Sequence, residues 1–467
     1  MSEFKLLIGG KLVPGAATLN VINPATEDVF ATAPRADHAQ LDQAVAAAKA
    51  AFPAWSATPI RQRGALLAKL ADELEARQND FARLLTEEQG KPLPHAMGEM
   101  IGTIAMMRYF ATLDMPLKVL KDDVTQKVVQ HHTSLGVVAA ITPWNYPMIL
   151  LVIKLAPALI TGNTVVAKPA PTTPLTTLKF GEICARILPA GVVNIIVDQN
   201  DLGSALTGHP DVAKVSFTGS TVTGKKVMES VAGTLKRLTL ELGCNDAAIV
   251  LDDVDPKEVA PKLFAAATLN AGQVCLAIKR LYVHGSQYDE MCEELGRLAR
   301  EVVVDDGMKQ GTQMGPLQNK AQFEKVKGFL ADARKNGKIV AGGDVLDRKG
   351  YFVQPTIVRD IGDDTRLVRE EQFGPVLPVL RYSNVDEAIA RANDTDYGLG
   401  GTVWGKDLDR AYAVAGKIDS GVVWVNKHLD MQPDVPFTGA KQSGMGAELG
   451  QAGLEEFTQA KIINMAK

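Results

Sequence analysis

The sequence predicts an α/β protein with two successive parallel sheets, and two observations support this prediction. Between residues 135 and 217, short apolar runs (LGVVAAI, NTVVAK, VVNIIV, AKVSF) alternate with helix-like segments. From about Cys244 the alternation starts again with AAIVLDD and RLYVHG, each followed by a helix pattern. Strands that alternate with helices pair in parallel through right-handed crossovers. The 467 residues, 46% of them apolar, allow two or three domains with large cores.

The segments on either side of these sheets are predicted from their periodicity. Asp37 can cap a helix through LDQAVAAAKAAF, and Ile60–Arg77 and Met97–Leu113 place apolar residues at steps of three and four. KVVQHHTSLG is polar and favours β structure, which predicts an exposed ribbon between larger units. The final residues, KIINMAK, predict a single strand that must pair with another part of the chain.

Composition and charge exclude several function classes. The net charge is −4 and no stretch clusters Lys and Arg, so we expect no nucleic-acid partner. The N-terminus lacks a basic segment followed by a long apolar run, so it does not resemble a secretory signal. Lys154, Pro157 and Gly162 interrupt the most apolar region, Met148–Ala167, which predicts a buried helix and strand and no membrane partner.

The cysteines indicate a reduced, cytoplasmic enzyme. Cys184, Cys244, Cys275 and Cys292 show no CxxC motif and no Cys/His metal spacing, so no metal is expected. NAGQVC ends in Cys275, and its Gly272 and Gln273 favour a turn that can present the thiol for attack on a carbonyl. A buried structural thiol is the alternative. Glu241, in LELG upstream, suits activation of water against a thioester.

FTGSTVTGKK, over Phe217–Lys226, follows a strand and opens a helix, and it nearly matches the phosphate-binding loop GxxxxGK[ST]. That loop needs a hydroxyl at its last position to hold magnesium, and Lys226 stands there. A P-loop nucleotide hydrolase is therefore disfavoured. A turn that receives a dinucleotide pyrophosphate at a helix N-terminus stays open, beside an ordinary tight turn.

ITPWNYP, over Ile141–Pro147, follows a buried strand and is stiffened by two prolines. The Asn145 side chain can donate an N–H to an oxyanion. A rigid loop with a solvent-facing amide is the alternative.

Together these motifs resemble the aldehyde dehydrogenase superfamily over essentially the whole chain. PWNYP, KPAP, FTGSTVTG, LELG, GQVC, EEQFGPV and PFTGAKQSGMGAELG occur in the family's order and spacing. The resemblance implies a Rossmann-type cofactor domain (1–114 and 135–243), an α/β catalytic domain (244–440), and a small β oligomerisation element with a tail (115–134 and 441–467). It implies a homodimer or homotetramer.

The resemblance also implies residue roles. Cys275 is the expected nucleophile and Glu241 the deacylation base, Asn145 helps to form the oxyanion hole, and Lys154 and Glu448 form a proton-relay pair. The residues expected to contact NAD or NADP are Ile141, Thr142, Pro143, Trp144, Lys168, Pro171, Gly219, Ser220, Thr223, Gly224, Leu242, Glu371 and Phe373. Thiolate adds to the aldehyde, hydride leaves to the nicotinamide, and water then releases the acid from a thioester.

Two positions depart from the family pattern. Cys244 stands where LELG is normally followed by glycine, and the sequence suggests no reason. Pro171 stands where NAD-selective members carry an acidic residue that grips the ribose diol. Without that carboxylate, and with Lys168 near the adenine ribose, the sequence predicts use of both NAD and NADP, with a preference below about tenfold.

The expected substrate tunnel is largely aliphatic, which favours a neutral aliphatic or aromatic aldehyde. Lys427 and His428 lie close enough to complicate this apolar picture. The alternatives are a CoA-acylating enzyme, which would not need Glu241, and a catalytically silent structural protein. The tunnel positions are Met100, Ile104, Tyr146, Ile149, Ile153, Leu269, Met431 and Phe437.

Overall fold

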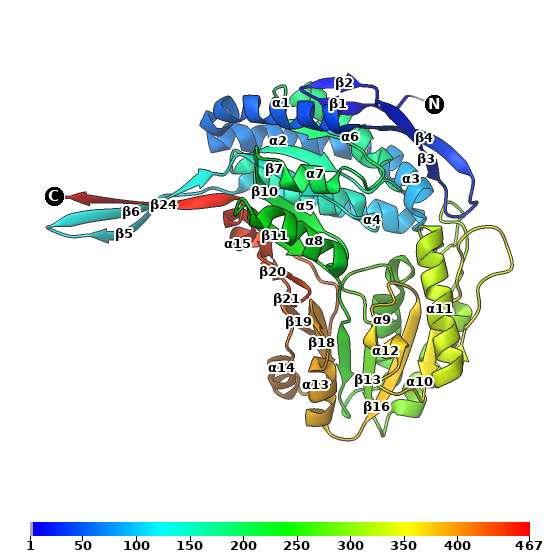
Figure 1. The fold of residues 1–467 in the computed structure, drawn as a ribbon. Coiled ribbons are helices and arrows are strands. Elements are labelled where there is room, and N and C mark those ends of the chain that lie inside the picture. Colours follow the sequence, from blue (N-terminus) through cyan, green and yellow to red (C-terminus); the bar gives the residue numbers. More distant parts are fainter. Residues whose placement is uncertain (1–2) are drawn as a thin grey trace.

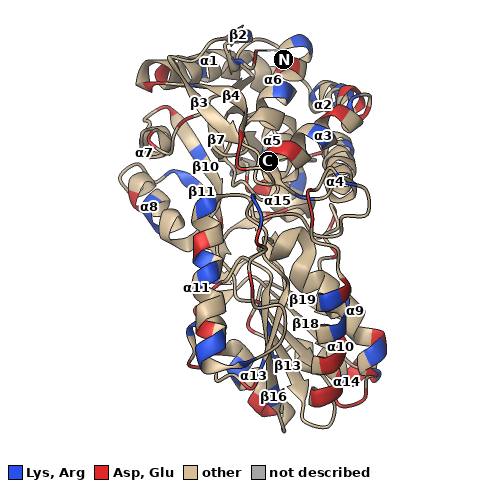
Figure 2. Ribbon diagram, turned by 90° about the vertical axis from the view of Figure 1, so that its right-hand side faces the viewer, with Lys and Arg blue, Asp and Glu red and all other residues tan. Residues whose placement is uncertain are grey.

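The computed structural model describes residues 3–467 and contains two large sheets with helices packed against them, and a narrow sheet that projects to one side (Figure 1). No helix in the described residues is long and apolar enough to cross a bilayer. Basic and acidic residues alternate along α11 (Lys320–Asn336), as Figure 2 shows. Mixed charge of this kind is typical of a solvated helix face.

The first sheet has the strand order β2-β1-β9-β8-β7-β10-β11-β22. Its five central strands are parallel, and β7, the first of them in the chain, lies between β8 and β10. Connections leave such a strand pair in opposite directions, which opens a crevice at the carboxyl ends. The crevice lies beyond Ile141 and Thr218, where β7 and β10 end. The strands are β1 (Leu6–Ile8), β2 (Lys11–Val13), β7 (Val137–Ile141), β8 (Thr164–Lys168), β9 (Val193–Ile195), β10 (Val212–Thr218), β11 (Arg237–Glu241) and β22 (Gly444–Met445).

Eight helices precede or connect these strands. The predicted cap is confirmed, because the Asp37 carboxylate accepts a hydrogen bond from the Gln40 backbone N–H at the start of α1. The two predicted helices that follow are confirmed as α2 and α4, while α3 was not predicted. The buried helix and strand expected over Met148–Ala167 are α5 and β8. The helices are α1 (His38–Ala57), α2 (Ile60–Glu75), α3 (Gln78–Gln89), α4 (Leu93–Thr112), α5 (Pro147–Ile160), α6 (Leu175–Ile187), α7 (Gly203–Gly208) and α8 (Thr221–Ala232).

The second sheet has the order β14-β15-β16-β13-β12-β18-β19, and all of its strands except β14 are parallel. This confirms that the alternation restarts after Cys244. The strands are β12 (Ala247–Val250), β13 (Arg280–His284), β14 (Lys338–Ala341), β15 (Thr356–Arg359), β16 (Val376–Tyr382), β18 (Gly400–Trp404) and β19 (Val422–Val425). The helices of this part are α9 (Pro256–Thr268), the 3₁₀ turn η1 (Leu269–Gly272), α10 (Tyr288–Glu301), α11, α12 (Arg366–Arg369), α13 (Val385–Asn393) and α14 (Leu408–Ala415).

The narrow sheet consists of β5 (Lys118–Asp122), β6 (Gln126–Ser134) and the C-terminal β24 (Thr458–Ala466). The final strand pairs with β6 along its whole length, and the two project together from the body of the protein (Figure 1). The sequence predicted β structure in the segments that form β6 and β24, and the structure shows that these two strands pair with each other.

The segment from residue 441 to the end of the chain does not form one unit. Although the sequence grouped 441–467 with the projecting element, β22 extends the first sheet antiparallel to β11. Backbone pairing with β11 holds this segment beside the core, so only β24 joins the projecting sheet. The remaining elements are α15 (Gly450–Glu455) and the pairs β3 (Ala17–Ile22) with β4 (Val29–Arg35), β17 (Tyr397–Gly398) with β21 (Ala440–Lys441), and β20 (Phe437–Thr438) with β23 (Ala447–Glu448).

Candidate active site

A groove follows the carboxyl edge of the first sheet and ends at Cys275. Its outer part is a cavity of about 590 Å³, and its inner part is a cavity of about 210 Å³ that is lined by Cys275. The two parts share walls made by the segments Pro143–Trp144 and Thr218–Ser220. These segments follow β7 and β10, so the groove occupies the crevice that the strand order creates.

The residues predicted to contact the cofactor line this groove, with two exceptions. Gly224 lies behind its wall, because a Cβ there would come within 2.3 Å of the Leu242 side chain. Pro171 is not in the lining, and Ala170 is. Ile141, Thr142, Lys168 and Thr223 line the outer part; Leu242, Glu371 and Phe373 line the inner part; Pro143, Trp144, Gly219 and Ser220 line both.

The lining also contains residues that the sequence did not indicate. They come from the loop after β9, from α7 and from α11, and no short motif marks them. Only the folded chain brings these segments to one edge of the sheet. Among them are Asn200, Gly203, Ser204, Thr207, Gln322 and Lys325, and Lys226 at the end of the FTGSTVTGKK motif also lines the outer part.

The turn between β10 and α8 is too short to be a P-loop. β10 ends at Thr218 and α8 begins at Thr221, so the TVTGK stretch that resembled a phosphate loop is already helical. The Ser220 side chain accepts a hydrogen bond from the Thr223 N–H and caps the helix. What remains is a helix N-terminus that faces the groove, a suitable place for a pyrophosphate.

The outer part offers polar groups that a dinucleotide can use. The hydroxyl oxygens of Thr142 and Thr218 are buried and have no hydrogen-bond partner among the described residues, and both residues line the groove. Buried hydroxyls are rarely left unpaired. Together with the α8 N-terminus they fit an elongated, polar, anionic ligand.

The Cys275 loop is held in an unusual backbone conformation. Asn270, Ala271 and Gly272 all have left-handed φ angles, between 52° and 73°. The Lys279 ammonium donates hydrogen bonds to the Gly272 and Val274 carbonyls at 2.9 and 3.0 Å. The turn-prone backbone predicted from the sequence is thus confirmed, and Cys275 is partly exposed while the other three cysteines are buried.

A carboxylate, Glu241, lies close enough to influence the thiol. Burial raises the pKa of Cys275 to about 12, and the Glu241 charge adds to that effect. Glu241 is the last residue of β11, is 4% exposed, and both of its carboxylate oxygens are buried without a partner among the described residues. Burial, reinforced by the charge of Glu448, raises the pKa of Glu241 well above its usual value. A carboxyl group with such a raised pKa keeps its proton to higher pH than an exposed glutamate does, which is typical of groups that exchange protons in active sites.

Lys154 and Glu448 form a buried ion pair behind this carboxylate. Their Nζ and Oε1 atoms are 2.5 Å apart, although the two residues are 294 positions apart in the chain. Lys154 comes from α5, and Glu448 from β23, which follows the β22 strand on the edge of the first sheet. Each partner changes the pKa of Glu241, Glu448 upward and Lys154 downward.

The Asn145 amide connects the two active-site loops. Its Nδ2 donates to the Gln273 carbonyl at 3.0 Å, two residues before Cys275. A side-chain amide nitrogen carries two hydrogens, so one remains for another acceptor. The Asn145 backbone carbonyl accepts hydrogen bonds from the Lys91 ammonium at 2.8 Å and from the Asn270 amide at 3.1 Å.

A buried pair missed by the sequence analysis supports this loop. Lys91 and Glu99 are 2.5 Å apart and both side chains are fully buried. Glu99 also accepts the Met148 N–H at 2.9 Å, at the start of α5. The pair therefore fixes both ends of the segment that carries Asn145. Lys91 and Glu99 reach this segment from the loop before α4 and from α4 itself, which no local pattern indicated.

Comparison with known proteins decides the family. The model described as "Aldehyde dehydrogenase family" matches residues 13–463. The chain belongs to the aldehyde dehydrogenase family. A phenylacetaldehyde dehydrogenase of Pseudomonas fluorescens is 40% identical, with 99% of this chain and 96% of the relative covered.

Solved structures agree with this assignment. A NAD⁺ complex of an aldehyde dehydrogenase from Bacillus cereus has a TM-score of 0.97 at 37% identity and covers 100% of this chain and 97% of its own. An NADP-dependent enzyme of E. coli has a TM-score of 0.97 at 34% identity, and the match covers 100% of this chain and 98% of the E. coli chain. The protein is therefore an NAD(P)-dependent enzyme that oxidises aldehydes.

Cys244 departs from the family pattern, and it lies against the backbone of the Cys275 loop. Its backbone N–H donates to Glu371 Oε1 at 3.2 Å, and its Sγ contacts the Cys275 carbonyl oxygen. The side chain is fully buried, and burial raises the pKa of this thiol well above its usual value. In this aldehyde dehydrogenase Cys244 therefore packs against the backbone of Cys275 as a buried thiol that resists deprotonation.

The predicted tunnel residues belong to the same apolar cluster as Cys275. Tyr146, Ile149, Leu269 and Met431 are partly exposed, and none of the four lines the two cavities of the groove. Met100 is fully buried and therefore supports the wall without contributing surface. The other buried members are Ile104, Ile153 and Phe437.

The two basic residues near the tunnel carry no free charge into it. His428 Nε2 contacts the Leu276 carbonyl, and burial lowers the pKa of His428 to about 4, so this side chain is neutral at pH 7. Lys427 pairs with Asp430 at 2.5 Å.

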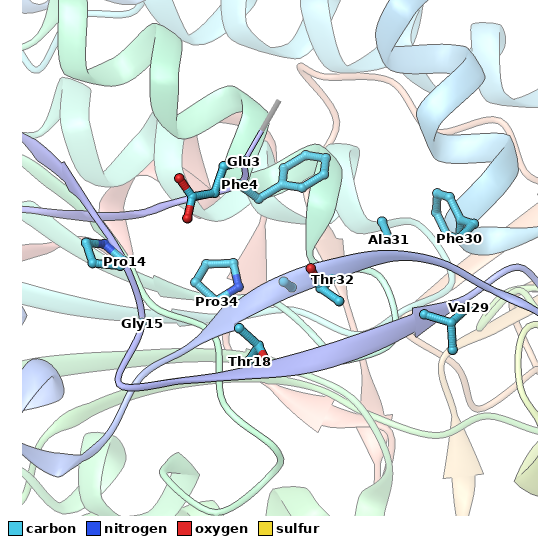
Figure 3. A pocket seen from close by; sticks show the side chains of 11 residues that line it. Glu3, Phe4, Pro14, Gly15, Thr18, Val29, Phe30, Ala31, Thr32 and Pro34 are labelled. Carbon is cyan, nitrogen blue, oxygen red and sulfur yellow. The ribbon is translucent and has the colours of Figure 1, made fainter. Parts of the chain in front are cut away.

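A further cavity, of about 500 Å³, lies between the N-terminal segment and the β3–β4 ribbon (Figure 3). Its lining contains one carboxylate, from Glu3, and is otherwise made of apolar side chains, threonines and a glycine. It contains no cysteine, in contrast to the groove that ends at Cys275.

Proposed function

We propose that the protein oxidises a neutral aliphatic or aromatic aldehyde to its carboxylic acid through a thioester on Cys275, with hydrolysis assisted by Glu241. The observation that carries this proposal is that Cys275 lines the inner end of the groove, while the buried Glu241 carboxylate, whose oxygens have no partner among the described residues, lies close enough to raise the pKa of the Cys275 thiol. A free carboxylate beside a thiol provides both a nucleophile and a base for water.

The residues of this chain would act in sequence. The Cys275 thiol would lose its proton to solvent water, and the resulting thiolate would add to the carbonyl carbon, while the free Asn145 N–H and the Cys275 backbone N–H stabilise the oxyanion. The bound dinucleotide supplies the hydride acceptor, which leaves a thioester. Glu241 takes a proton from water as the water attacks, and the acid and the thiolate separate. The Lys154–Glu448 pair can relay the proton away from Glu241.

The same geometry suggests how the dinucleotide is held. The α8 N-terminus and Ser220 would face the pyrophosphate, and Glu371 would hold the nicotinamide ribose beside Phe373 in the inner part. Phe373 packs edge-on against Trp144, with ring centroids 5.4 Å apart, which gives this wall a fixed shape.

An aldehyde panel tests the proposal directly. The protein would be assayed with neutral, anionic and cationic aldehydes, with NAD and NADP, with and without CoA, and reduced cofactor and products would be measured. Free acid from neutral aldehydes without CoA is the expected product. A strict requirement for CoA, with acyl-CoA as product, would favour the acylating alternative and remove hydrolysis from the function of Glu241.

Replacing Asn145 with alanine should lower kcat/KM by about 10²–10³, because one oxyanion donor is lost. Steady-state kinetics would measure the loss. Since Nδ2 also bonds to the Gln273 carbonyl, the melting temperature of the variant serves as the control. Near-normal kinetics would exclude the amide from the oxyanion hole, and an equal loss of stability and activity would assign it a structural role.

We also propose that the projecting sheet mediates a homodimer or homotetramer. Exposed apolar side chains on β5, β24 and their flanks include Leu117, Val119, Ile462 and Met465, each more than half exposed. Apolar surface on a narrow projecting sheet favours burial against another chain. We expect Ile462→Lys to lower the mass measured by light scattering. An unchanged mass would place the interface elsewhere.

A further inference from the structure

The outer end of the groove contains a second buried ion pair. Lys168, the last residue of β8, lies 2.6 Å from Asp198 Oδ1, and Asp198 follows the neighbouring strand β9. The Asp198 side chain is fully buried, and its other oxygen accepts the Leu202 N–H at 3.0 Å. Both oxygens of this carboxylate are therefore occupied, and the Lys168 charge is neutralised inside the protein.

This pair lies where the adenosine half of a dinucleotide must bind. A dinucleotide whose reacting ring is beside Cys275 in the inner part extends its other half into the outer part. Lys168 lines that outer part, together with Asn200 and Ser204 from the segment that Asp198 begins. The only chemical difference between NAD and NADP, a phosphate on the adenosine ribose, is therefore sensed in this region.

We propose that Asp198 is a specificity-determining residue that makes this enzyme prefer NAD over NADP, an inference that rests on the proposed placement of the dinucleotide. A 2′-phosphate needs a nearby cation, and Lys168 can serve only by leaving Asp198. The buried Asp198 carboxylate would then be left unpaired near the phosphate. The free energy lost in this way exceeds the free energy gained from the new contact between Lys168 and the phosphate. A ribose hydroxyl can accept a hydrogen bond from the paired ammonium without breaking the pair.

A second lysine in the lining does not replace Lys168. Lys226 lies on α8 and is exposed, so water and salt screen its attraction for a phosphate. The expectation of nearly equal use of the two cofactors counted the Lys168 charge as free. The Lys168–Asp198 pair removes that premise.

Calorimetric titration of the whole protein with NAD and with NADP tests this inference without relying on turnover. In the unmodified protein the Kd for NADP should exceed that for NAD by about tenfold or more. Asp198→Asn, which keeps an acceptor for Leu202 but frees Lys168, should tighten NADP binding about tenfold and change NAD binding less than about threefold.

The matched control is Asp201→Asn, three residues further along. Asp201 is exposed, pairs with Arg35 at 2.6 Å and is not in the groove lining. The Asp201→Asn substitution removes one negative charge from the same loop, and the ratio of the Kd for NADP to the Kd for NAD should not change. If Asp198→Asn folds poorly, Lys168→Met provides a second test. It leaves the Asp198 carboxylate unpaired, and it should raise the Kd for NADP relative to the Kd for NAD.

The possible failures are distinct. Absence of binding of either nucleotide to the unmodified protein would overturn the proposed function itself. Equal affinity for NAD and NADP, or a ratio that Asp198→Asn leaves within about twofold, would overturn the specificity inference alone. A shift of equal size in Asp201→Asn would assign the effect to general loop charge and would also overturn it.

Discussion

Replacing Cys275 with alanine is expected to abolish aldehyde oxidation, with a loss of about 10⁴-fold or more, because the acyl-enzyme requires a sulfur nucleophile. NAD binding should persist, since the outer part of the groove is unchanged. Steady-state assays would measure the loss, calorimetry the binding, and mass spectrometry the modification of this position by a thiol reagent.

Cys292→Ala is the matched control. Cys292 is buried in α10, on the second sheet's side of the molecule, so this variant should retain activity and labelling. If Cys275→Ala still turned over and still reacted at the site, another thiol would carry the chemistry, and Cys244 would be the first to examine because its Sγ contacts the Cys275 carbonyl.

Replacing Glu241 with glutamine should separate hydride transfer from hydrolysis. Neither addition of the thiolate nor hydride transfer needs a base for water, so rapid mixing should show a burst of reduced cofactor near one equivalent per site. Steady turnover should fall about 10²–10⁴-fold, the range for a lost general base. Hydroxylamine should restore turnover, because it attacks the thioester without help. Glu455→Gln, an exposed change in α15, should behave like the unmodified enzyme.

The pKa of Glu241 also predicts a pH dependence. Because burial raises this pKa well above its usual value, the carboxylate form accumulates only as pH rises through the raised pKa. Hydrolysis-limited turnover should therefore increase as pH rises through this raised pKa, and Glu241→Gln should lose this increase. No burst, slow thiol labelling and no rescue by hydroxylamine would instead assign Glu241 to activation of Cys275.

The sequence could predict most of the loops that form the active site, because each is a short contiguous motif. The prolines of PWNYP, the glycine of GQVC and the strand-to-helix turn at Gly219 fix their backbones through local sterics. The structure confirms the left-handed backbone before Cys275 and the helix that begins just after Ser220. It leaves the catalytic roles to be tested by the variants above.

The sequence by itself determined the alternation of strands and helices, the two sheets, and the family to which the chain belongs. Periodicity and turn chemistry are local properties, so they are readable without the fold. Only the tertiary structure decided that β22 joins the first sheet, that Lys91 and Glu99 support the Asn145 loop, and that Asp198 neutralises Lys168. These depend on contacts between segments distant in the chain or on neighbouring strands. Burial then sets the strength of each charge, and burial is a property that the whole fold creates.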